Sequence, residues 1–148
     1  MSDYKSKNRH KFLLQYHIIF VCKYRKKLFL LKHISDDIKN FSIDICNKNN
    51  ILIKYMETDK DHIHYMIETT PNISICKIVK LIKSYTTYHI WRKHYKYLRK
   101  YFWKEKTFWT DGYFATSIGN VYDNGASFYN KASEDKIKTI LKDEIKIK

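Results

Sequence analysis

The sequence predicts an α+β domain built on a ferredoxin-like antiparallel sheet with helices packed on one face. Two observations lead to this fold class. Segments with strand and helix patterns follow one another in the order βαββαβα, with a hairpin in the middle and helical crossovers on either side. The 148 residues show no repeat, linker or break in composition, so residues 1–148 are expected to form a single domain. Hydrophobic residues make up 44%, and three Gly and one Pro are too few for a disordered or collagen-like chain.

The first half of the chain supplies three strands and one helix. Residues 14–22 are rich in β-branched and aromatic side chains and predict a buried strand. Residues 35–48 predict an amphipathic helix with Ser35 as N-cap. Residues 51–58 and 61–69 predict a hairpin closed by a short polar turn. The apolar residues at helical spacing in and beside the 35–48 segment are Ile34, Ile38, Phe41 and Ile45.

The second half begins with a long helix. Pro71 and Asn72 end the hairpin, and residues 73–93 predict a helix. Residues 94–112 are aromatic and basic without a clean period, which indicates a loop or a broken helix. Residues 113–118 predict a fourth strand ended by Gly119 and Asn120, and residues 126–146 predict a last helix outside the ferredoxin-like core. The apolar face of the 73–93 helix is expected to hold Ile75, Ile78, Val79 and Ile82.

The charge of the chain points to a polyanionic partner. Lysine and arginine number 29 against 15 acidic residues, a net charge of +14, and 16% of the residues are aromatic. Lysines interleaved with aromatic rings are typical of nucleic-acid binding. A Lys-, Ile- and Asn-rich composition bias is the alternative explanation of the charge. We expect no membrane span and no secretion signal, and three scattered cysteines predict no disulfide framework, so a cytoplasmic protein is expected.

The motif that carries the clearest chemistry is a pair of histidines in the 61–69 strand. Strand alternation places His62 and His64 on one face and Ile63 on the other. If the Ile63 face packs on the helices, both imidazoles stand on the open face of the sheet. They can then bind one divalent ion and leave positions for substrate oxygens. Two half-buried structural histidines are the alternative.

Tyrosine is the reactive side chain present in excess, with 13 copies. The sequence has no phosphate-binding loop of the GxxxxGK[ST] type and few carboxylates for a two-metal nuclease. A phenol can attack a phosphodiester when the phosphate charge is stabilised, but periodicity cannot choose among the tyrosines.

Three blocks, LLQYHIIFVCKYRKKLF, METDKDHIHYMIETTP and KTFWTDGYFATSIGNV, occur in an order and spacing that resemble the single-tyrosine HUH transposases. These are the TnpA-type transposases of the IS-two-hundred-like insertion sequences, and the likeness runs from about residue 14 to about residue 130. The resemblance implies an RRM-like sheet and a C-terminal helix that carries the catalytic tyrosine. It also implies a homodimer that recognises DNA hairpins, cleaves and rejoins single-stranded DNA, and forms a 5′-phosphotyrosyl intermediate.

The resemblance also assigns site residues. His62 and His64 match the metal ligands, with Mg²⁺ or Mn²⁺ as the expected ion. The family's tyrosine lies eight residues beyond the valine of its Gly-Asn-Val block, which is Tyr129 here, with Tyr122 as the competing candidate. The position one helical turn later, where the family has a glutamine ligand, holds the weaker ligand Ser133. Glu134 or Asp135 can replace it, or water can complete the site.

Two basic groups are expected to contact DNA phosphates, although a solvated helix face or charge run is the alternative for both. They are the block Lys23, Arg25, Lys26 and Lys27 and the stripe Lys77, Lys80 and Lys83. Trp103, Phe108 and Trp109 either stack bases or belong to the core or the dimer interface. The rival to the transposase is a non-catalytic or domesticated hairpin-binding or single-strand-binding protein on the same sheet.

Overall fold

The computed structural model describes residues 13–120, which form one antiparallel sheet and two long helices. The strands lie in the order β2-β3-β1-β4. Both neighbours of β1 pair with it in the antiparallel sense, and so do β2 and β3. This order and the element sequence βαββαβ confirm the predicted ferredoxin-like, RRM-like α+β fold. The strands are β1 (Leu14–Val21), β2 (Leu52–Asp59), β3 (His62–Thr69) and β4 (Phe114–Asn120).

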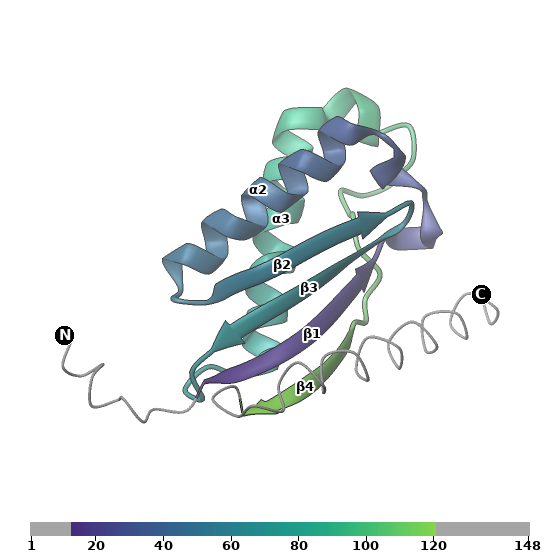
Figure 1. Ribbon diagram of the computed structural model, residues 1–148. Coiled ribbons are helices and arrows are strands. Elements are labelled where there is room, and N and C mark those ends of the chain that lie inside the picture. Colours follow the sequence, from purple (N-terminus) through teal and green to yellow (C-terminus); the bar gives the residue numbers. More distant parts are fainter. Residues whose placement is uncertain (1–12, 121–148) are drawn as a thin grey trace.

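Both helices, α2 (Lys32–Lys48) and α3 (Ile75–Leu98), pack on the same face of the sheet (Figure 1). The core between the layers is built largely from isoleucine and aromatic side chains. Ile34 and Ile38 of α2 and Ile78 and Ile82 of α3 are fully buried, as their spacing predicts. The hydroxyl groups of Ser42 and Tyr65 lie 2.7 Å apart, which satisfies both polar groups inside this core.

The structure differs from the sequence-based prediction at the N-termini of both helices. α2 begins at Lys32, and Ser35 lies inside it rather than at its N-cap. The Ser35 hydroxyl instead lies 2.8 Å from that of Thr58 on β2, so a contact across the layers replaces the predicted cap. α3 begins after Ser74, whose side chain accepts a hydrogen bond from the backbone N–H of Lys77.

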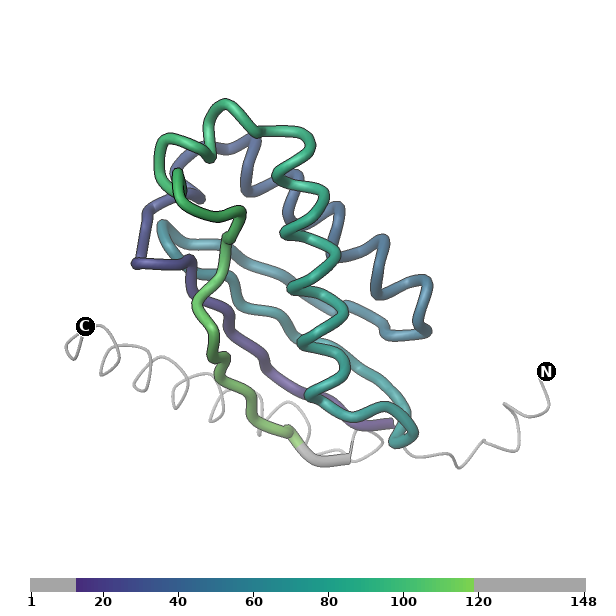
Figure 2. Tube along the Cα trace, turned by 180° about the vertical axis from the view of Figure 1, so that it is seen from behind, coloured from purple at the N-terminus to yellow at the C-terminus, as the bar shows by residue number. Residues whose placement is uncertain are grey.

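The other differences lie after α3. The helix continues to Leu98, because Leu98 is fully buried and anchors its last turn, and it bends at His94. Strand β4 includes Gly119 and Asn120, which were expected to end it. Figure 2 shows the chain leaving α3, turning at one end of the sheet and running into β4 along the sheet edge. The predicted helix over 126–146 lies outside the described residues. Within residues 13–120, no helix is long and apolar enough to cross a membrane.

Candidate active site

Strand β3 presents two histidines on the sheet face opposite the helices. Ile63, Tyr65 and Ile67 are fully buried in the core between sheet and helices, and the residues between them are only partly buried. His62 and His64 therefore point to the open face, as strand alternation predicts. The pairing of β1 with β3 sets Val21 opposite His62 and Ile19 opposite His64. The loop that follows β1 consequently adjoins the His62 end of the site.

Asp61 holds the His62 ring from one side. Its Oδ1 lies 3.1 Å from Nδ1 of His62, and its Oδ2 accepts from Nε of Arg25 at 3.0 Å and lies 2.8 Å from the second guanidinium nitrogen, Nη2. A carboxylate that accepts the Nδ1 proton fixes the tautomer in which Nε2 carries the lone pair. Asp61 and Arg25 thus orient His62 for binding a ligand through Nε2.

The loop that supplies Arg25 has an unusual backbone. Tyr24 and Arg25 have φ angles of 57° and 56°, in the left-handed region that side chains other than glycine rarely adopt. Hydrogen bonds from the backbone N–H of Cys22 to the carbonyl of Asp61 (2.8 Å) and from that of Lys23 to the carbonyl of Phe108 (2.8 Å) hold the start of this loop. Residues in such conformations persist only where their surroundings fix them and are concentrated at functional sites.

A third histidine, His17 of β1, joins the site and was not singled out in the sequence. Its Nδ1 lies 2.7 Å from Nε2 of His64, the ring centroids are 4.8 Å apart, and His17 is fully buried. In this contact one nitrogen donates and the other accepts. If Nε2 of His64 donates, the lone pair of His64 is on Nδ1. His17 then orients the His64 ring in the same way as Asp61 orients the His62 ring. The contact depends on the register between β1 and β3, which the local sequence does not reveal.

Glu57 of β2 is a further acidic side chain on this face. It lies opposite His64 in the pairing of β2 with β3. Its Oε1 accepts a hydrogen bond of 2.6 Å from the hydroxyl of Tyr55. The alternating pattern of the strand gave no reason to select it, because the register of the hairpin decides which β2 residue faces His64.

The structure separates the predicted basic residues into three surroundings. Arg25 is engaged with Asp61, and Lys23 pairs with Asp111 at 3.6 Å. Lys26 is partly exposed, whereas Lys27, Lys77 and Lys80 are exposed. The ammonium of Lys83 donates to the carbonyl oxygens of residues 110, 111 and 112 at 2.8, 3.2 and 2.8 Å, which ties α3 to the segment before β4.

Several nucleophilic side chains of the described region are held in their neutral forms. Burial raises the pKa of the Cys46 thiol to about 12. Burial and the neighbouring Asp61 raise the pKa of Cys22 well above its usual value. Burial also raises the pKa of the Tyr65 phenol, which is enclosed in the core. None of these three groups is suited to act as a nucleophile at neutral pH.

The remaining site predictions fall on residues that the structure does not describe. Tyr129, its competitor Tyr122, and the candidate third ligands Ser133, Glu134 and Asp135 lie outside residues 13–120. Among residues 13–120, no group of three or more His, Cys, Asp and Glu side chains converges in a way that suits a metal ion. The described part of the chain therefore contains two of the predicted metal ligands, His62 and His64, together with the groups that orient them.

Comparisons with known proteins place the chain in a family. The model of the family described as "Transposase IS200 like" matches residues 10–131. The transposase for insertion sequence element IS200 of Salmonella typhimurium is 26% identical over 119 residues, covering 80% of this chain and 76% of that protein. The ISDra2 transposase TnpA of Deinococcus radiodurans is 31% identical over 81 residues, covering 55% of this chain and 57% of that protein.

Two solved structures share the fold. A candidate transposase from Deinococcus radiodurans R1 has a TM-score of 0.71 and 21% identity, covering 88% of this chain and 90% of its own. A REP-associated tyrosine transposase bound to a REP hairpin has a TM-score of 0.53 and 12% identity, covering 74% of this chain and 59% of its own. The antiparallel sheet with its two helices is thus a fold that this chain shares with both proteins. The chain belongs to the IS200-like transposase family and is a transposase enzyme.

Proposed function

We propose that this transposase cleaves and rejoins single-stranded DNA at the ends of an insertion sequence, after recognising DNA hairpins, with Tyr129 as nucleophile. The observation that supports the proposal best is the pair of open-face imidazoles, His62 and His64, each held at one ring nitrogen by a neighbouring side chain. Histidines that bind a metal ion are typically oriented in this way, by a hydrogen bond at the second ring nitrogen. The hairpin in the REP-associated relative supports the choice of substrate.

The reaction we propose is a transesterification, in which a phosphodiester of the DNA is exchanged for a phosphotyrosine ester. The phenol oxygen of Tyr129 attacks the scissile phosphorus and gives up its proton to water. The bond from phosphorus to the 3′ oxygen breaks, and the 3′ oxygen takes up a proton from water and leaves as a free hydroxyl. The 5′ end of the strand remains on the protein as a phosphotyrosine ester. A 3′-hydroxyl later attacks this ester, restores a phosphodiester and releases the phenol. Bond count and charge balance in both steps, so no external energy source is needed.

His62 and His64 fit a Mg²⁺ or Mn²⁺ site, because their ring nitrogens are oriented and both rings are only partly buried on one sheet face. Such an ion, when bound, stabilises charge on the scissile phosphate. Asp61, itself held by Arg25, orients the His62 ring through Nδ1, and His17 contacts Nε2 of His64. Ser133, Glu134, Asp135 or water is the proposed third ligand.

Covalent capture tests this proposal. The full chain is incubated with a labelled single strand that contains a hairpin, with Mg²⁺ or with EDTA, and run on a denaturing gel. We expect a labelled protein band with Mg²⁺ and none with EDTA. Hairpin binding without any labelled band would contradict the proposal and favour the non-catalytic binder. Sedimentation at twice the 18.1 kDa chain mass would support the proposed homodimer, and sedimentation as a monomer in the presence of hairpin DNA would contradict it.

A further inference from the structure

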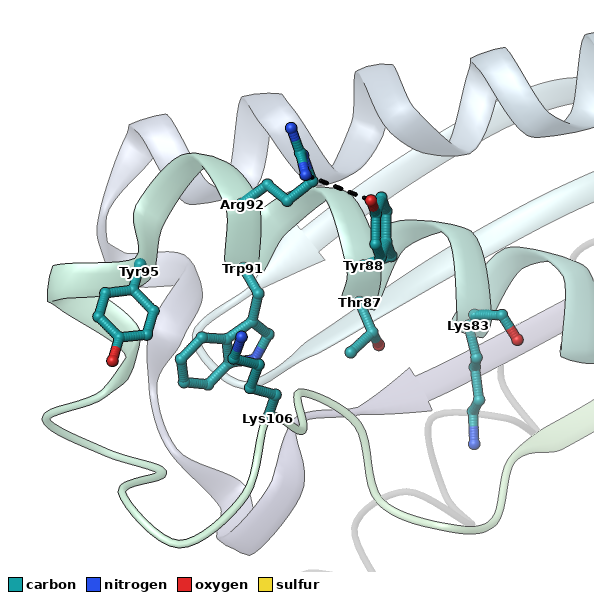
Figure 3. Close-up of a pocket in the computed structure, with 8 residues that line it drawn as sticks. Lys83, Thr87, Tyr88, Trp91, Arg92, Tyr95 and Lys106 are labelled. Atoms are coloured by element: carbon teal, nitrogen blue, oxygen red, sulfur yellow. Dashed lines mark hydrogen bonds between the residues drawn. The ribbon is translucent and has the colours of Figure 1, made fainter.

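A groove runs along α3 beside the segment that leads into β4 (Figure 3). Helix α3 packs on the face of the sheet opposite His62 and His64 (Figure 1). Its volume is about 850 Å³, and none of the residues that line it is acidic. Tyr88, Trp91 and Tyr95 recur at spacings of three and four, so one face of α3 carries all three rings. The side chains on which the argument rests are Tyr88, Trp91, Arg92, Tyr95 and Lys106.

The three aromatic side chains differ in their exposure to solvent. Trp91 is only 5% exposed, and its indole Nε1 donates to the carbonyl of Thr107 at 2.8 Å, so this ring is a fixed part of the groove wall. Tyr88 and Tyr95 are 58% and 47% exposed. The exposed rings of Tyr88 and Tyr95 lie on either side of the anchored Trp91. Together they form a surface on which planar groups can stack.

Cations lie over both exposed rings. The guanidinium of Arg92 is 5.5 Å from the centroid of Tyr88 and donates to its hydroxyl at 3.3 Å. The ammonium of Lys106, which comes from the opposite wall, is 5.7 Å from the centroid of Tyr95. Each exposed ring is thereby paired with a cation that can neutralise the phosphate of a nucleotide bound there.

The segment of the chain that lines the groove is strongly basic. Residues 77–106 contain ten lysines and arginines and a single acidic residue, Glu105. The ten are Lys77, Lys80, Lys83, Arg92, Lys93, Lys96, Arg99, Lys100, Lys104 and Lys106. A protein segment would have to be strongly acidic to match this surface, whereas a nucleic-acid strand supplies both the negative charge and the flat rings.

We infer that this groove is a second DNA-contact site, which stacks unpaired bases of single-stranded DNA between Tyr88 and Tyr95 and places their phosphates against Arg92 and Lys106. The identity of the ligand as DNA rests on the proposed function. Because the groove and the His62–His64 pair lie on opposite faces of the sheet, the groove holds a part of the strand that is remote from the scissile phosphate.

Binding of a fluorescent oligo(dT) of about 15 nucleotides, which forms no hairpin, tests the inference by anisotropy with the full chain. Replacing Tyr88 and Tyr95 together by Leu should weaken binding about tenfold or more, because base stacking is lost while apolar volume remains. Arg92→Gln should weaken binding and lower the salt slope by about 0.7. Lys48→Gln is the matched control, because Lys48 lies 5.1 Å from the centroid of Tyr85 and 3.3 Å from its hydroxyl, outside the groove. It should change binding less than Arg92→Gln.

The outcomes separate this inference from the proposed function. Equal affinity of the wild type and the double tyrosine variant, both shown to be folded by their thermal unfolding, would overturn the inference. Preference of the wild type for oligo(U) over oligo(dT) would overturn DNA as the ligand. If the wild type forms the covalent adduct on a hairpin strand but the double variant binds oligo(dT) normally, the inference alone fails. If no adduct forms while the double variant loses oligo(dT) binding, the proposed function alone fails.

Discussion

Replacing Asp61 by Ala removes the carboxylate that contacts both His62 and Arg25. Without it, no acceptor fixes the proton on Nδ1 of His62, and the ring can rotate or change tautomer. Loss of such an orienting group typically costs about 10- to 100-fold in metal affinity. We therefore expect Asp61→Ala to weaken Mn²⁺ binding by about that factor, while the hydrogen bond from Cys22 to the backbone carbonyl of residue 61 (2.8 Å) remains.

The same substitution should destabilise the fold. The side chains of Arg25 and Asp61 are 15% and 14% exposed, and their closest atoms are 2.8 Å apart. Exposed ion pairs contribute up to about 1 kcal/mol, and breaking a buried pair costs about 3–5 kcal/mol. An intermediate loss of about 2 kcal/mol in the free energy of unfolding is therefore expected, because the guanidinium is left without its carboxylate.

Electron paramagnetic resonance of Mn²⁺ measures the affinity, and urea unfolding measures the stability. Asp36→Ala is the matched control, because Asp36 pairs with Lys32 at 3.1 Å but is half exposed. The control should change stability by less than about 0.5 kcal/mol and leave Mn²⁺ affinity unchanged. Equal Mn²⁺ affinity of the Asp61→Ala and Asp36→Ala proteins would refute the orienting role of Asp61.

Three further predictions concern Asp37, Lys83 and Ser133. Burial raises the pKa of the Asp37 carboxyl, but hydrogen bonds from His94 and Lys93 lower it more, so the folded pKa lies below the ordinary value. The unfolded state then binds more protons between the two pKa values, so Asp37→Asn should cost about 1–2 kcal/mol at pH 7, and the difference should vanish as pH falls through the folded pKa. Lys83→Met breaks three bonds to carbonyls and should cost about 1–3 kcal/mol, against under about 0.5 for exposed Lys80→Met. Ser133→Gln, which supplies an amide oxygen, should raise adduct formation at low Mg²⁺ and have less effect at saturation.

Each of these has an outcome that would contradict it. Urea midpoints of Asp37→Asn and wild type that differ as much at pH 3 as at pH 7 would remove the electrostatic explanation. Equal midpoints for Lys83→Met and Lys80→Met would show that the bonds to residues 110–112 add nothing to stability. No response to Ser133→Gln at any Mg²⁺ concentration would mean that Glu134, Asp135 or water already completes the site.

Patterns within one element were predictive here. Alternation in β3 gave the face of His62 and His64, and helical spacing gave the buried isoleucines of α2 and α3. The order of the elements gave the sheet, because hairpins and crossovers restrict which strands become neighbours. Each of these signals depends on residues that are close in the sequence.

The failures concern contacts between distant residues. His17 and His64 are 47 residues apart, and only the register between β1 and β3 brings them together. The sequence gives no sign that Lys77, Lys80 and Lys83 differ. In the structure, however, the ammonium of Lys83 donates to the backbone carbonyl of Thr110, in the segment before β4. Of the three aromatic residues considered for base stacking, Phe108 and Trp109 are buried in the core, whereas Trp103 is 75% exposed. Spacing alone cannot distinguish these surroundings.

Mass spectrometry of the protein–DNA adduct is the most direct test of the central claim, because it reports the chemistry and identifies the nucleophile together. A hairpin-containing single strand is incubated with the full chain and Mg²⁺, and the digest is searched for the peptide that carries the nucleotide mass. We expect that mass on Tyr129, none on Tyr122, and no adduct from Tyr129→Phe, which removes one oxygen and keeps the ring. An adduct on another residue, or one that persists in Tyr129→Phe, would contradict the account.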